Sequence, residues 1–169
     1  HNGNIFVNGR FVPGGFSVEN GRFTHVLEET AEGEGTDLCG AYVIPGLVDI
    51  HTHGNSGADF SDGDYAGLVR MARYLARRGV TSFAPASMTL PYDALDKAFH
   101  AAARLHKAAP AGCARLMGIR MEGPFFSEKK KGAQNAAYLR LPDYDAFARL
   151  YDAAEGLLTA VILLLAEYL

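Results

Sequence analysis

The 169-residue sequence lacks the features that mark several large classes of protein. It has only two cysteines, Cys39 and Cys113, in no close motif, so we expect no disulfide framework and a cytoplasmic location. A formal net charge of -3 gives no indication that the chain binds nucleic acid or an anionic membrane. No apolar segment near the start has the length of a signal peptide core. With 49% hydrophobic and 21% charged residues, the composition is that of an ordinary globular protein.

Long apolar runs and phosphate-binding glycine motifs are also missing. The longest apolar run, at residues 156–166, is shorter than the roughly 20 residues that span a membrane, so we expect a core element there. No G-x-G-x-x-G sequence follows the apolar segment at residues 42–50, which disfavours a dinucleotide-binding fold.

The order of expected elements changes near residue 41. Before it, short strand-like segments alternate with turn signals such as Asn8-Gly9, which is typical of a small antiparallel β unit. After it, strands are expected at 42–50, 80–84 and 115–121, and helices at 65–76, from 91 onward and at 143–155. This alternation predicts an α/β fold with parallel strands. It fits either an open doubly wound sheet or the first three βα units of a (β/α)8 TIM-type barrel.

Two histidines follow the first of these parallel strands. Residues two apart in a strand point to the same side, so His51 and His53 can aim two imidazoles at one metal ion. The alternative is a polar strand end that faces water. Asp49 is expected to hydrogen-bond an imidazole. Surface or packing roles are expected for the other four histidines, His1, His25, His100 and His106.

A carboxylate stands at the end of the third expected strand. Glu122 precedes Gly123-Pro124, which is expected to force a sharp exit from the strand. A carboxylate in this position needs a cation or hydrogen-bond donors. A metal ion would serve, and so would an ion pair with Arg120 or a nearby lysine. Catalytic groups of (β/α)8 barrels lie at the carboxyl ends of strands, so His51, His53 and Glu122 favour the barrel over the open sheet.

The loop at residues 127–135 contains three successive lysines followed by Gly-Ala-Gln-Asn. Such lysines are typical of a solvated surface, and the alternative is attraction of an anionic substrate such as a phosphate ester. The main chain and side-chain amides around Ala133 and Gln134 are compatible with a sugar-binding loop.

Several of these short sequence motifs together resemble those of a known family. Pro-Gly-Leu-Val-Asp-Ile-His-Thr-His-Gly at 45–54 resembles the opening barrel strand of the amidohydrolase superfamily. Glu-Gly-Pro-Phe at 122–125 and Lys-Gly-Ala-Gln-Asn at 131–135 narrow the resemblance to the N-acetylglucosamine-6-phosphate deacetylase family. The resemblance covers residues 4–155 and implies an N-terminal fragment. Residues 1–41 would be a small β-sandwich portion, and 42–169 the N-terminal part of a metal-dependent hydrolase barrel.

This resemblance implies a hydrolase that converts N-acetylglucosamine 6-phosphate to glucosamine 6-phosphate and acetate. Glu122 would be the main metal ligand, with His51 and His53 at an additional metal position, and Ala133 and Gln134 would contact the substrate. The implied cofactor is one or two divalent ions, zinc or iron, which polarise the amide carbonyl and lower the pKa of bound water. The implied partner is a small phosphorylated amino sugar, and a homodimer is compatible with the resemblance.

The sequence departs from that family at Arg120, where many members have histidine. Two further metal-binding histidines and the catalytic aspartate would lie beyond residue 169, so residues 1–169 alone are expected to be unstable and inactive. Two alternatives stay open. One is another amidohydrolase, acting on cyclic amides or N-acyl amino acids. The other is a non-catalytic α/β binding module with His51 and His53 on its surface.

Overall fold

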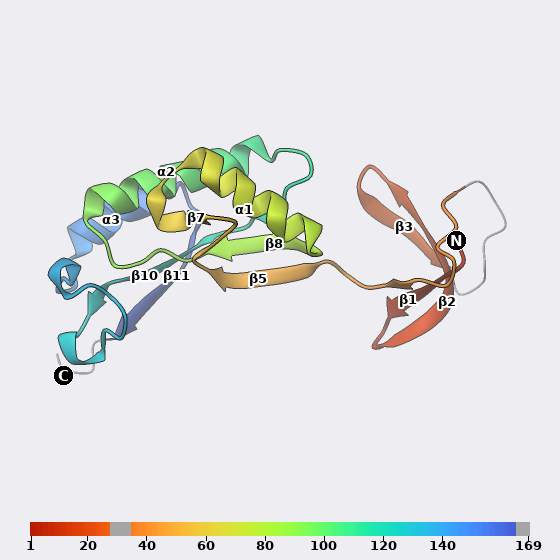
Figure 1. The fold of residues 1–169 in the computed structure, drawn as a ribbon, viewed down its shortest axis with the longest axis horizontal. Helices are drawn as coiled ribbons and strands as arrows, with labels where there is room; N and C mark the ends of the chain where they lie inside the picture. The colour runs from red at the N-terminus through yellow and green to blue at the C-terminus, as the bar shows by residue number, and fades with distance from the viewer. Residues whose placement is uncertain (28–34, 165–169) are drawn as a thin grey trace. The chain divides into compact units, whose positions relative to one another are not determined.

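A computed structural model describes residues 1–27 and 35–164 (Figure 1). The chain divides into two compact units, His1–Pro45 and Gly46–Leu169, which are described separately. No helix in the described ranges is both long and apolar enough to cross a membrane. The last two residues of the apolar run predicted as a core element, 165 and 166, lie outside the described ranges.

The first unit is a four-stranded sheet of turn-punctuated strands. These are β1 (Gly3–Val7), β2 (Arg10–Glu19), β3 (Arg22–Leu27) and β4 (Tyr42–Val43), in the order β3-β2-β1-β4. Asn8 has a positive φ and is followed by Gly9, as a tight Asn-Gly turn between β1 and β2 requires. The pairs β1–β2 and β2–β3 are antiparallel, as predicted, whereas β4 lies parallel to β1.

The strand predicted at residues 42–50 is in fact two strands in different units. Tyr42–Val43 pairs with β1, whereas β5 (Leu47–Thr52) belongs to the second unit. Pro45 has no N–H to donate to a sheet ladder. Gly46 passes so close to Thr81 that an added Cβ would overlap the Thr81 side chain. These two residues explain why the apolar run does not continue as one strand.

The second unit alternates strands and helices. In chain order it contains β5, β6 (Gly54–Asn55), β7 (Ala58–Asp59), α1 (Tyr65–Arg77), β8 (Val80–Pro85), α2 (Tyr92–Ala108), β9 (Arg115–Leu116), β10 (Ile119–Phe126), α3 (Tyr144–Ala153) and β11 (Leu158–Leu164). The parallel sheets β5-β8-β9 and β10-β11 are joined by a parallel bridge between Ala86 and Arg120. The predicted α/β class is therefore confirmed.

A fourth parallel strand follows the three that were predicted. β11 lies beside β10, with Ile119 opposite Leu158 and Glu122 opposite Ile162. The prediction of three βα units therefore missed this strand. The apolar run that forms it has no alternation of apolar and polar residues, so its sequence indicated burial without indicating a strand.

Three helices pack on one face of the parallel strands (Figure 1). Asp64 and Asp143 cap α1 and α3 by accepting hydrogen bonds from main-chain N–H groups in the first turn. Ile119 and Met121 of β10 belong to the core cluster that also contains the buried side chains of the helices. Because side chains alternate along a strand, Glu122 points to the opposite face from Met121.

Strand β10 continues through Gly123-Pro124 instead of leaving the sheet there. Glu122 is opposite Ile162 and Phe126 is opposite Leu164, so the register slips inside the strand. The predicted sharp exit is therefore wrong, and an irregularity within the strand takes its place. Gly123 has φ 78°, and a Cβ at this position would overlap the Thr89 hydroxyl. Glycine allows the segment after β8 to approach β10 at this point.

Candidate metal centre

Strands β5 and β10 bring three potential metal ligands together. Glu122 Oε2 lies 3.1 Å from His51 Nε2 and 3.4 Å from His53 Nε2. One donor atom from each of the three side chains lies within 4.8 Å of the other two. His51 is exposed, and His53 and Glu122 are half-buried. The convergence expected from the strand pattern is therefore present, and the role of these residues as metal ligands stays a prediction.

A hydrogen bond determines which nitrogen of His53 carries the proton. His53 Nδ1 lies 3.0 Å from the main-chain oxygen of Ala86, just after β8. A carbonyl oxygen can only accept, so Nδ1 is the donor, and the Nε2 of a neutral ring has a lone pair. That lone pair faces Glu122 Oε2, which is also an acceptor. Either a second proton on His53 or a metal ion must offset the repulsion between these two atoms.

The second oxygen of Glu122 is bonded to the side-chain amide of Gln134. Gln134 Nε2 donates to Glu122 Oε1 at 2.8 Å, and Gln134 Oε1 accepts from the Thr89 main-chain N–H at 2.7 Å. Gln134 is only 4% exposed, whereas Ala133 next to it is exposed. The family resemblance implies that both residues contact substrate. The structure shows the Gln134 amide bonded to Glu122.

Asp49 differs from its expected role, and Arg120 does not form the ion pair with Glu122 that was the alternative to a metal ion. Asp49 Oδ1 accepts from the main-chain N–H of His51 at 3.0 Å, so the predicted bond to an imidazole is replaced by a local bond along its own strand. Within the described ranges, the ion pairs of Glu122 are to the two histidines and not to Arg120. Arg120 Nε is buried and has no hydrogen-bond partner among the described residues.

The segment after β8 supplies groups that sequence reasoning missed. Ala86 provides the carbonyl that orients His53, and Ser87 Oγ accepts from the Glu122 main-chain N–H at 3.3 Å. Thr89 provides the N–H that orients Gln134. Ser87 and Thr89 are buried polar residues directly after an apolar strand. Their position could have marked them as candidate site residues from the sequence, because functional groups of (β/α)8 barrels lie at the carboxyl ends of the strands.

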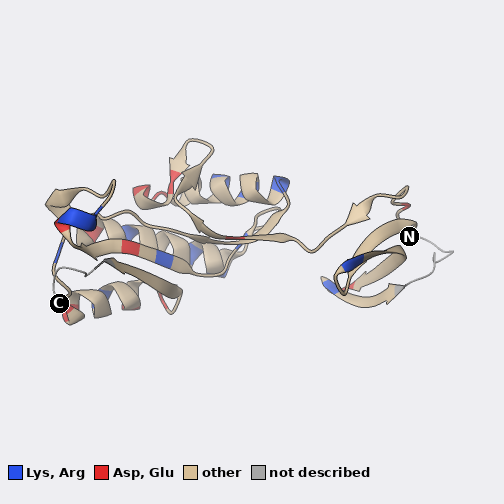
Figure 2. Ribbon diagram, turned by 90° about the horizontal axis from the view of Figure 1, so that it is seen from below, with Lys and Arg blue, Asp and Glu red and all other residues tan. Residues whose placement is uncertain are grey.

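The three successive lysines lie in the loop after β10, which is a blue stretch of the ribbon in Figure 2. Lys129 and Lys130 lie in a short 3-10 helix, Glu128–Lys130, and both are exposed. Lys131 Nζ donates to the main-chain oxygens of Gln134 at 3.0 Å and Gly132 at 3.4 Å. Lys131 therefore closes the loop that carries Gln134, and its ammonium group is engaged inside that loop.

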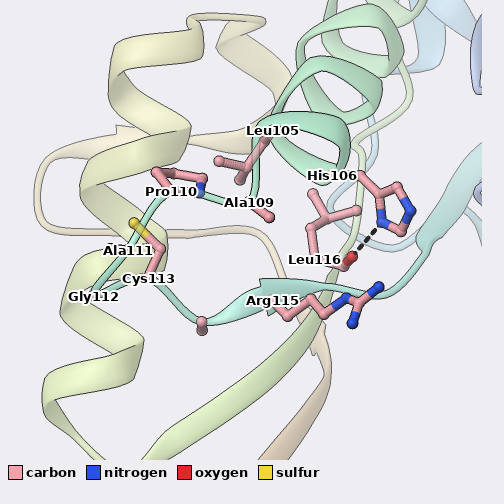
Figure 3. A pocket seen from close by; sticks show the side chains of 10 residues that line it. Leu105, His106, Ala109, Pro110, Ala111, Gly112, Cys113, Arg115 and Leu116 are labelled. Atoms are coloured by element: carbon pink, nitrogen blue, oxygen red, sulfur yellow. Dashed lines mark hydrogen bonds between the residues drawn. The ribbon is translucent and has the colours of Figure 1, made fainter. Parts of the chain in front are cut away.

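A separate pocket of about 420 Å³ lies between the end of α2 and the start of β9 (Figure 3). His106, which lines it, has Nδ1 2.8 Å from the Leu116 main-chain oxygen. None of His51, His53 and Glu122 lines this pocket. His106 is thus engaged in local packing, as expected from its sequence context.

The chain is similar in sequence to a family of known proteins. Residues 42–161 match the sequence model of the Amidohydrolase family. The N-acetylglucosamine-6-phosphate deacetylase of Bacillus subtilis (strain 168) is 37% identical over 124 residues, which cover 72% of this chain and 31% of that protein. The deacetylase of the same name from Bos taurus is 33% identical over 145 residues, covering 84% and 35%. The chain thus spans about a third of the length of these curated relatives.

Solved structures share the fold of the chain. A mutant N-acetyl-D-glucosamine-6-phosphate deacetylase from Mycobacterium smegmatis, in complex with N-acetyl-D-glucosamine-6-phosphate, superposes with a TM-score of 0.83 at 25% identity, over 95% of this chain and 42% of that chain. The Pasteurella multocida N-acetylglucosamine-6-phosphate deacetylase has a TM-score of 0.82 at 24% identity, over 96% and 43%. Because the family model matches more than half of its residues, the chain belongs to the amidohydrolase family.

Proposed function

We propose that these 169 residues are the N-terminal region of a metal-dependent deacetylase that hydrolyses N-acetylglucosamine 6-phosphate to glucosamine 6-phosphate and acetate. Family membership supports a hydrolase, and the names of the relatives support this substrate. Glu122 supports this choice over amidohydrolases that act on cyclic amides or N-acyl amino acids, which commonly use a lysine of the fourth strand as the bridging ligand. The fourth parallel strand of this chain, β11, contains no lysine in residues 158–164.

One observation carries the metal proposal: His53 Nε2 lies 3.4 Å from Glu122 Oε2, while Nδ1 of the same ring lies within hydrogen-bond distance of the Ala86 carbonyl. A divalent cation beside Nε2 and Oε2 turns the repulsion between a neutral ring and the carboxylate into coordination. Imidazole nitrogens and carboxylate oxygens suit zinc, iron and other first-row ions, so the donor set fits the family's cofactor. When bound, such an ion supplies Lewis acidity toward the amide carbonyl and lowers the pKa of bound water.

The residues of the chain then have distinct tasks. His51, His53 and Glu122 hold the ion, and the Ala86 carbonyl places the proton of the neutral His53 ring on Nδ1, so that Nε2 can be the ligand. Ala133 and Gln134 are proposed to contact the sugar; since the Gln134 amide is engaged with Glu122, we assign the contact to the main chain around exposed Ala133. The remaining metal ligands and the aspartate that moves the proton are proposed to lie in a further part of the protein. That part would correspond to the two thirds of the curated relatives that these 169 residues do not cover.

We further propose that the parallel strands are the first of a (β/α)8 barrel, with residues 1–41 forming part of a small β-sandwich. The exposed apolar side chains of β5 support this, because Leu47, Val48 and Ile50 are 52%, 62% and 63% exposed. Later strands would cover them. A parallel sheet exposed in this way is prone to aggregation, so residues 1–169 alone are proposed to be unstable and inactive.

Assaying the longest protein that the gene encodes tests this function. We expect acetate release from N-acetylglucosamine 6-phosphate, loss of activity after chelation and recovery with zinc or ferrous ion. Activity on unphosphorylated N-acetylglucosamine shows whether the phosphate is required. Activity on a cyclic amide and on an N-acyl amino acid tests whether the protein is one of the other amidohydrolases. Preference for either of those would contradict the proposed substrate. A protein that holds no metal and hydrolyses none of these compounds would favour a binding module.

A further inference from the structure

We infer that Gln134 is a positioning residue that occupies one oxygen of Glu122 and leaves only the other oxygen for the metal ion. This inference rests on the proposed metal centre, and it adds a role for Gln134 in that centre. Glu122 Oε1 accepts from Gln134 Nε2 at 2.8 Å, whereas Oε2 faces both imidazoles. The two oxygens of one carboxylate therefore have different surroundings.

The orientation of the Gln134 amide follows from a main-chain group. The Thr89 N–H lies 2.7 Å from the Gln134 side chain, and an N–H needs an acceptor. The amide oxygen must therefore point to Thr89, and the NH2 group must point to Glu122. The amide cannot rotate by half a turn without placing two donors together at Thr89 and two acceptors together at Glu122.

The surroundings hold this amide in place. Gln134 is 4% exposed and Thr89 is 2% exposed, so the bond between these two residues is shielded from water. The Lys131 ammonium group holds the Gln134 main-chain oxygen at 3.0 Å. The Thr89 hydroxyl lies 3.5 Å from the Glu122 main-chain oxygen, beside Gly123. Contacts from Thr89, distant in sequence, and from Lys131, in the same loop, thus hold the Gln134 amide against the Glu122 carboxylate.

The consequence for coordination is that Glu122 offers a single oxygen. Hydrogen bonds to ligating carboxylates orient them, and removing such a partner typically lowers metal affinity about 10–100-fold. Without the Gln134 donor, Glu122 could rotate or use both oxygens. Gln134 would then affect metal affinity and coordination even though it does not touch the ion.

Cobalt binding tests the inference without relying on activity, because the visible spectrum of Co²⁺ reports coordination. Gln134→Met removes both hydrogen bonds at similar side-chain length, and we expect a loss of about 10–100-fold in Co²⁺ affinity with an altered spectrum. Lys130→Met is the matched control, because Lys130 is an exposed lysine of the same loop and the substitution leaves the amide–carboxylate bond. Its affinity should stay within about twofold of the parent.

A second variant covers the case in which Gln134→Met fails to fold. Gln134→Glu keeps an oxygen for the Thr89 N–H but replaces the donor with a carboxylate oxygen beside Glu122, and its Co²⁺ spectrum should change. Affinities and spectra equal to the parent in the folded Gln134 variants would overturn the inference. A parent protein that binds no Co²⁺ would instead overturn the proposed metal centre.

Discussion

His51 Nε2 lies 3.1 Å from Glu122 Oε2, although the two residues belong to strands separated by two α-helices and four further strands in the chain. Such an approach requires the parallel arrangement in which β5 and β10 end at the same edge of the unit. Because the side chains of His51, His53 and Glu122 converge, replacing any one of them tests the same proposed metal centre.

The charge of Glu122 is expected to dominate metal affinity. Glu122→Gln preserves size but removes the negative charge, so affinity for Zn²⁺ should fall by more than the roughly 10–100-fold typical of outer-shell changes. Competition with a chromophoric chelator measures this. Glu128→Gln is the control, because Glu128 is an exposed carboxylate in the neighbouring loop, and it should bind Zn²⁺ like the parent. Equal affinities for the two variants would remove Glu122 from the centre.

Each imidazole of the pair should also contribute. His51→Ala and His53→Ala are expected to lower the Zn²⁺ content of the purified protein, measured by elemental analysis. His100→Ala provides the comparison, because the His100 side chain is 59% exposed and pairs with Asp96 within its own helix. Retention of full zinc content by the first two variants would mean that the strand end merely faces water.

Gly123 is expected to be sensitive to any side chain. In Gly123→Ala, the strain of the positive φ and the overlap with the Thr89 side chain both destabilise the folded state. The free energy of unfolding should therefore fall by about 1–3 kcal/mol. Gly9→Ala has a similar φ of 81° but meets no atom within 4 Å, so its loss should be smaller. Urea titration of both variants gives the comparison. Thr89→Ala should recover part of the Gly123→Ala loss, and no recovery would exclude the proposed overlap.

A pH dependence follows from Tyr92. Burial raises the pKa of its hydroxyl, and the nearby Asp143 carboxylate raises it further. The folded state therefore retains this proton more strongly than the unfolded chain. The stabilisation is fully present below the ordinary tyrosine pKa of about 10 and is lost as pH rises through the folded value. Tyr92→Phe should reduce the decline of unfolding free energy above about pH 10, whereas Tyr151→Phe, at an exposed site, is the control. Parallel declines in parent and Tyr92→Phe would contradict this.

Sequence reasoning predicted those parts of the fold that local pattern determines. The helices and the parallel strand–helix order follow from the periodicity of apolar residues. The interruption at Pro45-Gly46 and the continuation of β10 past Gly123 depend on contacts with Thr81 and Thr89, which are distant in sequence. Pro45 was a local signal for the first of these features, whereas the contacts with Thr81 and Thr89 are visible only in the folded structure.

In the candidate site too, local sequence predicted some features, and contacts between distant residues determine the others. Alternation along a strand was enough to place His51 and His53 on one side, and the apolar strand ending at Glu122 was enough to suggest a partner. The bonds that orient these groups come from Ala86 and Gln134, whose partners lie on other elements. Such partners become visible only when the elements are assembled.

X-ray absorption of the zinc-loaded protein tests the central claim most directly, because it reports the atoms around the ion. We expect a shell of nitrogen and oxygen donors at about 2.0–2.2 Å. Outer-shell imidazole scattering should be present in the parent and reduced when His51 and His53 are both replaced by alanine. Imidazole scattering unchanged by this double replacement, or a parent protein that retains no zinc, would contradict the claim that these two histidines and Glu122 share one metal ion.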